Sequence, residues 1–310
     1  MTDPTTIFDR ALVRQRRDRA AATLSGHDYL HREIAERLGD RLGDIDRRFA
    51  RALDLGCHGG QIGRLAALEG QVEWLAQCDL SPAMAALAPR GDSRVRLAGD
   101  EEALPFAPAV FDLVLSATGL QWVNDLPGTL IQLRRAITPD GVLLACLPGG
   151  ATLGELRAVL TEAELAEDGG ASPRVSPFVD IRDAAALLQR AGFALPVVDS
   201  DRITVTYADP GELLRDLRRS GEANALVERR RAPLRRGTLA RAMALYRDRY
   251  PAPGGRISAT FEILTLTGWA PHADQPKPLR PGSATQRLAA ALGAEEQPAG
   301  EAAPRRSGRK

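Results

Sequence analysis

The sequence contains few cysteines, no long apolar run and no excess of charge. Its three cysteines, Cys57, Cys78 and Cys146, include no C-x-x-C pair, which disfavours a disulfide framework or a structural zinc site and indicates a reducing compartment. No run approaches the ~18 apolar residues of a membrane-spanning helix, so we expect no membrane insertion. The 41 basic and 40 acidic residues leave a net charge of +1, so we expect no nucleic-acid partner.

The first residues lack the apolar stretch of a secretory signal peptide. They are rich in arginine, as mitochondrial transit peptides are, but Asp3, Asp9 and Asp18 interrupt them, and such peptides are poor in acidic residues. We therefore expect a cytoplasmic protein.

Strands and helices are expected to alternate along the first half of the chain. Short apolar runs predict strands at 51–56, 72–79, 94–98, 111–117 and 140–148. Amphipathic spacing and capping residues predict helices at 28–42, at 60–69, from Ser81 onward and at 125–137. Such repeated units indicate an α/β fold, a parallel sheet with helices on both faces.

The second half is less regular. We expect helices at 152–166, 181–191, 210–219 and 237–249, and β segments at 194–199, 202–207 and 256–269. From about residue 288 the chain has almost no large apolar residue, so we expect a disordered tail over 288–310.

Glycine-rich or acidic elements follow three successive predicted strands. The stretch 54–60 reads DLGCHGG, Asp79 ends the second strand, and Asp100 and Glu101 follow the third. A glycine-rich turn brings backbone N–H groups close to a ligand, and an acid in the place of Asp79 can accept ribose hydroxyls. A tight turn or a helix-capping acid explains each element alone, but the ordered set indicates a ligand site beyond the carboxyl ends of the strands.

The segments DLGCHGG, CDLSPAM, GDEEALPF and FDLVLSATGLQWVNDL resemble class I S-adenosylmethionine-dependent methyltransferases. The resemblance implies S-adenosyl-L-methionine as cofactor and a Rossmann-like, mixed seven-stranded sheet with helices on both faces, here with an N-terminal helical segment and a C-terminal extension. It also implies the residues that hold the cofactor, which are Asp54, Gly56, His58, Gly60, Asp79, Leu80, Asp100, Glu101 and Trp122.

Two of these residues leave alternatives open. His58 stands where the family has a glycine, and its ring would clash with the methionine part of the cofactor, reposition the loop or point to solvent. Trp122 would either cover the adenine or belong to the core.

Across about residues 7–286 the chain is similar to the respiratory complex I assembly factors of methyltransferase fold and their bacterial relatives. Phe8-Asp9-Arg10, Trp122–Pro127, Ser176-Pro177-Phe178 and Gly282–Thr285 carry part of this resemblance. It implies a protein substrate, a complex I subunit, and the hydroxylation of an arginine of that subunit. A malonyl-acyl-carrier-protein methyltransferase of biotin synthesis is the second interpretation, and a non-catalytic assembly chaperone is the third.

An arginine substrate requires a carboxylate partner. The candidates are Asp9, Asp125 and Glu155, although a helix cap is the favoured role for Asp125 and Glu155 could equally pair with Arg157 or lie on a solvated face.

His27 and His31 have the i, i+4 spacing of metal ligands, but no third ligand is evident in the sequence. The family it resembles lacks this histidine pair, so we expect no metal site.

We divide the chain into four parts. They are an N-terminal helical cap (1–45), an S-adenosylmethionine-binding core (46–150), a C-terminal half that completes the sheet and the substrate region (151–287) and the tail (288–310).

Overall fold

The structure is a computed structural model that describes residues 6–276, 289 and 292–294. Residues 1–272 compose one compact unit, which contains the sheet and its helices, and the residues from 273 onward compose a second unit. The disordered tail predicted over 288–310 lies outside the described residues, except at 289 and 292–294.

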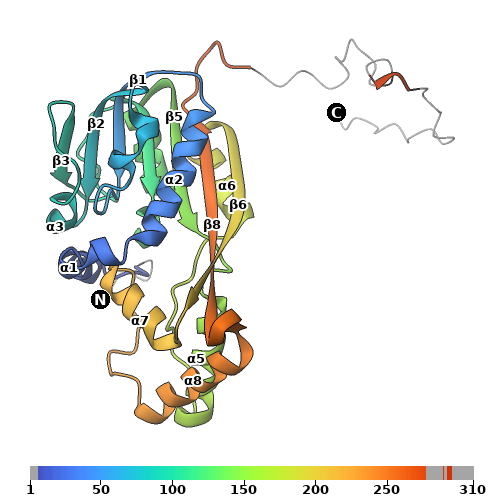
Figure 1. Ribbon diagram of the computed structural model, residues 1–310. Coiled ribbons are helices and arrows are strands. Elements are labelled where there is room, and N and C mark those ends of the chain that lie inside the picture. Colours follow the sequence, from blue (N-terminus) through green and yellow to red (C-terminus); the bar gives the residue numbers. More distant parts are fainter. Residues whose placement is uncertain (1–5, 277–288, 290–291, 295–310) are drawn as a thin grey trace, which may run out of the picture. The chain divides into compact units, whose positions relative to one another are not determined.

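A mixed sheet forms the centre of this unit (Figure 1). Its strands are β1 (Phe49–Leu55), β2 (Val72–Asp79), β3 (Arg94–Ala98), β4 (Phe111–Ala117), β5 (Ile137–Pro148), β6 (Ala194–Tyr207), β7 (Pro251–Ala252) and β8 (Arg256–Trp269). The order is β3-β2-β1-β4-β5-β8-β6, with the short β7 beside β8. The first five strands are parallel, and β8 runs antiparallel to β5 and β6. The expected mixed sheet is thus confirmed.

Helices cover both faces of the sheet because its inner strands are apolar on both sides. In β5, Val142, Leu144 and Cys146 pack toward α2 (Tyr29–Gly43). The residues between them, 143, 145 and 147, pack on the opposite face with α4 (Leu126–Ala136) and α6 (Ile181–Arg190). This alternation is the two-residue period of a strand buried on both faces.

The remaining helices surround the ends of the sheet. They are α1 (Arg10–Ala20), α3 (Pro82–Ala85), α5 (Gly154–Asp168), α7 (Pro210–Arg219) and α8 (Arg236–Arg249), with 3-10 turns η1 (Leu24–Gly26), η4 (Leu120–Trp122) and η5 (Pro253–Gly255). In Figure 1, α5 and α8 lie near one end of the long β6–β8 pair, and α1 lies near α3. In the described part of the chain, no helix has both the length and the apolar character to cross a membrane.

The helix predicted over 60–69 is wrong. Two separate 3-10 turns, η2 (Ile62–Arg64) and η3 (Ala66–Leu68), occupy this stretch, and Leu65 between them is extended, with ψ 132°. Glycine is a weak helix former, and Gly63 lies so close to β2 that a Cβ there would be 2.3 Å from Gln77 Oε1. Close packing on the sheet therefore overrides the amphipathic pattern.

The two β segments predicted at 194–199 and 202–207 are one strand. β6 pairs with β8 in continuous register from Val197 to Tyr207. Ser200, in the polar stretch between the two segments, donates to Glu262 Oε1 at 2.9 Å, so cross-strand pairing holds the polar residues in the strand.

Gly56 follows β1 with a φ of +68°, and a Cβ there would lie 2.6 Å from the Cα of Gly119. We expect Gly56→Ala to lower the free energy of unfolding by more than the ~1–2 kcal/mol of left-handed strain, because the backbone contact must also open. Gly154→Ala is the control, since its Cβ meets nothing within 4 Å, and it should change stability by less than about 0.5 kcal/mol. Urea unfolding measures both, and equal stability of the two variants would show that the close contact is not a constraint.

Candidate functional site

The residues expected to hold the cofactor gather at the carboxyl ends of β1 to β4. Parallel pairing places Leu55 beside Cys78 and Asp79 beside Ala98, so the segments that follow these strands leave the sheet at one edge. The glycine turn follows β1, and Asp100 and Glu101 follow β3. The structure therefore brings the sequence-predicted set together.

The glycine turn buries His58. Gly56 and Gly60 have φ values of +68° and +77°, and His58 itself has a φ of 46° with only 1% of its surface exposed. Its Nε2 lies 3.0 Å from the carbonyl oxygen of Thr118, and its backbone N–H donates to Asp79 at 3.0 Å. Burial, and then the charge of Arg17, hold the pKa of His58 well below its usual range. The ring is therefore neutral and does not point to solvent.

Arg17 of α1 meets the acids that end β2 and follow β3. Its Nη1 lies 3.4 Å from Asp79 Oδ1 and 3.3 Å from Glu101 Oε1, and none of these three side chains is exposed. Asp79 also accepts the backbone N–H of Ser81 at 2.8 Å. Burial alone would lower the pKa of Arg17, but the charges of Asp79 and Glu101 raise it above its ordinary value. The guanidinium thus compensates two buried carboxylates.

Arg10 extends this ionic cluster toward the surface. Its guanidinium pairs with Asp100 at 2.6 Å and also contacts Glu101. Every acid predicted after β2 and β3 therefore faces an arginine of α1, a pairing that no local pattern in the sequence indicates.

Asp54 is the one predicted acid without a partner. Its side chain is buried near the end of β1, and neither carboxylate oxygen is hydrogen-bonded within the described part of the chain. Burial, and then the charge of Asp79, raise its pKa well above the usual range. An unpartnered buried carboxyl is costly and typical of a ligand site.

A cavity of about 670 Å³ lies beside this cluster, lined by parts of α1, α2, η4, α5 and α7 and by the segment that follows α7. Trp122 lines it, whereas Asp54, Asp79, Asp100 and Glu101 do not. Trp122 also packs edge to face on Phe8, with ring centroids 5.3 Å apart, and Leu80 packs against the same small cluster. Trp122 is therefore both a core residue and part of the cavity wall.

Two acids line the cavity, Asp216 and Glu222. Glu222 Oε2 accepts from Trp122 Nε1 at 2.9 Å and from Gln121 Nε2 at 3.2 Å, while Oε1 lies 3.8 Å from His31 Nε2. Burial opposes ionisation of Glu222, but the contact with His31 and the charge of Arg17 lower its pKa to about 2. Its role was missed because its partners lie about a hundred residues or more away in the sequence.

The three carboxylates predicted to meet the substrate are placed elsewhere, and none lines the cavity. Asp9 caps α1 and pairs with Arg229 at 3.3 Å. Asp125 caps α4, accepting from Gly128 N at 2.8 Å. Glu155 accepts the backbone N–H of Thr260 at 3.3 Å. Each has a partner within the fold.

The raised pKa of Asp54 gives a stability prediction. An acid whose pKa in the folded chain lies above its unfolded value of about 3.9 lowers the free energy of unfolding when it ionises. This loss grows as the pH rises above about 3.9, by up to about 1.4 kcal/mol per pH unit. Asp54→Asn cannot ionise. Without cofactor it should have a larger free energy of unfolding than the wild type at pH 7, and the difference should vanish toward pH 4.

Urea unfolding at several pH values tests this expectation. Asp46→Asn, at an exposed position, is the control and should follow the wild type at every pH. A wild type as stable as Asp54→Asn at pH 7 would mean that Asp54 is not desolvated in the folded chain.

Comparison with known proteins agrees with the fold. The methyltransferase domain family matches residues 53–145. In the solved structures, the YcgJ protein of Bacillus subtilis has a TM-score of 0.53 at 15% identity, over 76% of this chain and 98% of its own. Phosphoethanolamine N-methyltransferase 2 of Haemonchus contortus, solved with S-adenosyl-L-methionine, has a TM-score of 0.53 at 16% identity, over 84% of this chain and 60% of its own.

Similarity to curated proteins extends over nearly the whole chain. The chain is 41% identical to the human mitochondrial arginine-hydroxylase NDUFAF5, over 92% of this chain and 83% of that protein. The zebrafish (Danio rerio) NDUFAF5 is 40% identical, over 91% and 88%. A malonyl-[acyl-carrier protein] O-methyltransferase of Halorhodospira halophila is 36% identical, over 84% and 88%. The chain therefore belongs to the class I S-adenosylmethionine-dependent methyltransferase family, in the group that includes NDUFAF5 and the malonyl-[acyl-carrier protein] O-methyltransferases.

Proposed function

We propose that this protein is an S-adenosylmethionine-binding enzyme that modifies an arginine side chain of a respiratory complex I subunit, by hydroxylation. The observation that carries the proposal is the extent of the similarity to NDUFAF5, which covers the half that builds the cavity as well as the cofactor half. We place its action in a reducing compartment, the cytoplasm, because Cys57, Cys78 and Cys146 are buried and free.

The strand ends supply the chemistry that the cofactor needs. In this proposal Asp79 accepts ribose hydroxyls, Asp100 and Glu101 reach the adenine, and Asp54 meets the charged methionine end together with Gly56, His58 and Gly60. Leu80 and Trp122 supply apolar surface. The bound cofactor supplies an electrophilic methyl group on a sulfonium.

Arg17 restricts cofactor binding in this arrangement. Its guanidinium lies against Asp79 and Glu101, and all three side chains are fully buried. Ribose hydroxyls can therefore reach Asp79 only if the Arg17 side chain withdraws. We propose that Arg17 compensates these acids when no cofactor is bound and gives way when it binds.

A substrate guanidinium would meet Asp216 and Glu222 in the cavity. A carboxylate forms charge-assisted hydrogen bonds with a guanidinium, and a buried guanidinium without one is strongly disfavoured. Because Asp216 and Glu222 line the cavity and Asp9, Asp125 and Glu155 do not, we propose Asp216 and Glu222 in their place.

The arginines of the cavity favour a second candidate, methyl transfer to malonyl-acyl-carrier protein, whose substrate carboxylate would need a cation. The cavity is lined by Arg16, Arg19, Arg174, Arg218, Arg219, Arg229 and Arg230. Three of them are already paired with acids, Arg174 with Glu164, Arg229 with Asp9 and Arg230 with Asp168. This pairing lowers the net positive charge available to an anion, so we rank this candidate second.

Intact-mass analysis of a complex I subunit co-expressed with the chain tests the proposal. Hydroxylation adds about 16 Da, methylation adds about 14 Da, and a non-catalytic chaperone adds nothing. Asp216→Asn and Glu222→Gln should each reduce the modified fraction at least about tenfold, because each removes a charge-assisted partner of the guanidinium. Glu33→Gln is the control, since Glu33 pairs with Arg37 on the surface of α2.

A parallel assay offers malonyl-acyl-carrier protein and S-adenosylmethionine to the purified chain. A gain of about 14 Da there, with no change in the subunit, would replace the arginine proposal by the second candidate. A subunit that gains about 14 Da would retain the substrate and overturn hydroxylation.

A further inference from the structure

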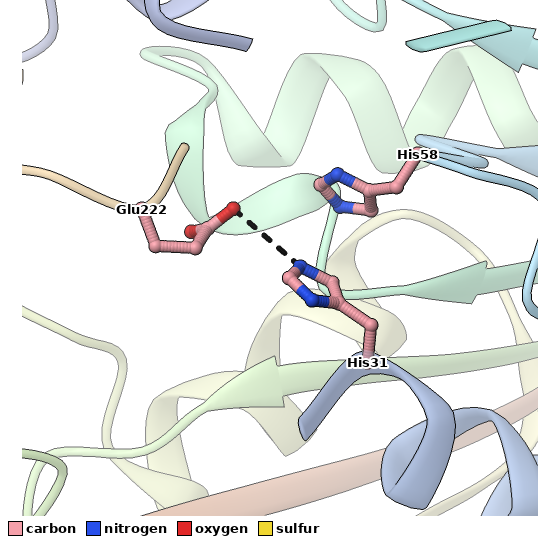
Figure 2. A group of neighbouring side chains, drawn as sticks. All are labelled: His31, His58 and Glu222. Atoms are coloured by element: carbon pink, nitrogen blue, oxygen red, sulfur yellow. Dashed lines mark ion pairs between the residues drawn. The ribbon is translucent and has the colours of Figure 1, made fainter. Parts of the chain in front are cut away.

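Three side chains from distant parts of the sequence converge beside the cavity. His31 comes from α2, His58 from the glycine turn after β1, and Glu222 from the segment after α7. Figure 2 shows the two rings next to each other, with the Glu222 carboxylate directed at His31. One ligand atom from each residue lies within 4.8 Å of the others, and the ring centroids are 4.5 Å apart.

These distances are close to those of a metal site. Two ligand atoms bound to one ion at about 2.1 Å each lie at most about 4.2 Å apart. His31 Nε2 and Glu222 Oε1 are already 3.8 Å apart. Binding therefore requires side-chain shifts of under about 1 Å, within the reach of rotation about side-chain bonds.

The polar atoms of the cluster are not satisfied by the fold. His31 and His58 are 4% and 1% exposed. His58 Nδ1 and Glu222 Oε1 have no hydrogen-bond partner within the described residues. A plain polar network would leave these atoms unpaired, at a cost of about 1–3 kcal/mol each. The cluster is thus better explained by a ligand than by a structural role.

Neighbouring groups hold the three side chains in place. Glu222 Oε2 is fixed by Trp122 and Gln121, so that Oε1 is left free. His58 contacts the carbonyl of Thr118. Hydrogen bonds of this kind orient the ligands of known metal sites. The positive charge of Arg17 disfavours a cation nearby, but Asp79 and Glu101 pair with Arg17 and offset that charge.

We propose that His31, His58 and Glu222 bind one divalent transition-metal ion of the class that prefers imidazole and carboxylate ligands. His31 and Glu222 line the cavity of about 670 Å³, so the remaining coordination positions of the ion face it. Two histidines and one carboxylate with open positions are typical of ferrous sites, and ferrous iron is the natural occupant to test. The proposal concerns binding alone and holds whichever reaction the enzyme performs. With the ion bound, Glu222 is its ligand, and Asp216 is the cavity carboxylate left to meet a substrate guanidinium.

Titration of the full chain with Co²⁺, after treatment with a chelator and under anaerobic conditions, tests the site. Co²⁺ replaces Fe²⁺ and has visible absorption that reports its coordination. We expect one ion per chain and a higher melting temperature with the metal than without it. Fe²⁺ should compete for the same site.

Variants assign the ligands. His31→Gln, His58→Gly and Glu222→Gln should each weaken Co²⁺ binding at least about tenfold, by analogy with losses at known sites. His27→Gln is the matched control, since His27 also lines the cavity but pairs with Asp216 at 2.7 Å, and it should bind Co²⁺ as the wild type does.

Two outcomes would overturn the proposal. One is a wild type that shows no cobalt absorption up to about 1 mM ion, an affinity too weak for a resident ion. The other is binding that the three variants retain or that His27→Gln also loses. Should one variant fail to fold, the wild-type titration and the remaining variants still decide the matter.

Discussion

The buried guanidinium of Arg17 is the interaction on which the arrangement of this site depends. Asp79 and Glu101 stand at adjacent strand ends with no access to solvent, and Arg17 lies between them. Removing one partner of a buried ion pair typically costs about 3–5 kcal/mol, because the charge left behind is uncompensated. The cluster therefore holds α1 against the edge of the sheet where the cofactor is expected.

The same helix positions the wall of the cavity. Arg16 donates to the carbonyl of Ala223 at 2.8 Å, and the backbone N–H of Asp9 donates to the carbonyl of Ala225 at 2.9 Å. These contacts fix the chain directly after Glu222, so the carboxylate that faces His31 is placed by α1. The cofactor edge and the cavity thus share one structural support, and withdrawal of Arg17 would affect both.

Much of the fold could be predicted from the sequence, because the signals are local. Apolar runs located the strands, Ser81 and Asp125 act as the helix caps that their positions suggested, and the acids at the strand ends do lie together. The helix at 60–69 failed because its amphipathic pattern competes with the close approach of Gly63 to β2.

The pairing within the site could not be predicted in this way. Arg17 lies 62 residues from Asp79, and Glu222 lies 100 residues from Trp122. Their encounters depend on how α1 and the segment after α7 pack, which no local pattern encodes. For the same reason His31 was paired in the sequence with His27, four residues earlier, whereas His27 lies outside α2 and the fold places His31 beside His58.

The competition between Arg17 and the cofactor for Asp79 is tested most directly by calorimetric titration of S-adenosylmethionine into the wild type and Arg17→Met, at a temperature where both are folded. Arg14→Met is the control, because Arg14 lies on the same helix with an exposed side chain. We predict that Arg17→Met binds the cofactor at least about tenfold more tightly, a difference of about 1.4 kcal/mol, while Arg14→Met binds as the wild type does. Equal or weaker binding by a folded Arg17→Met would contradict this account.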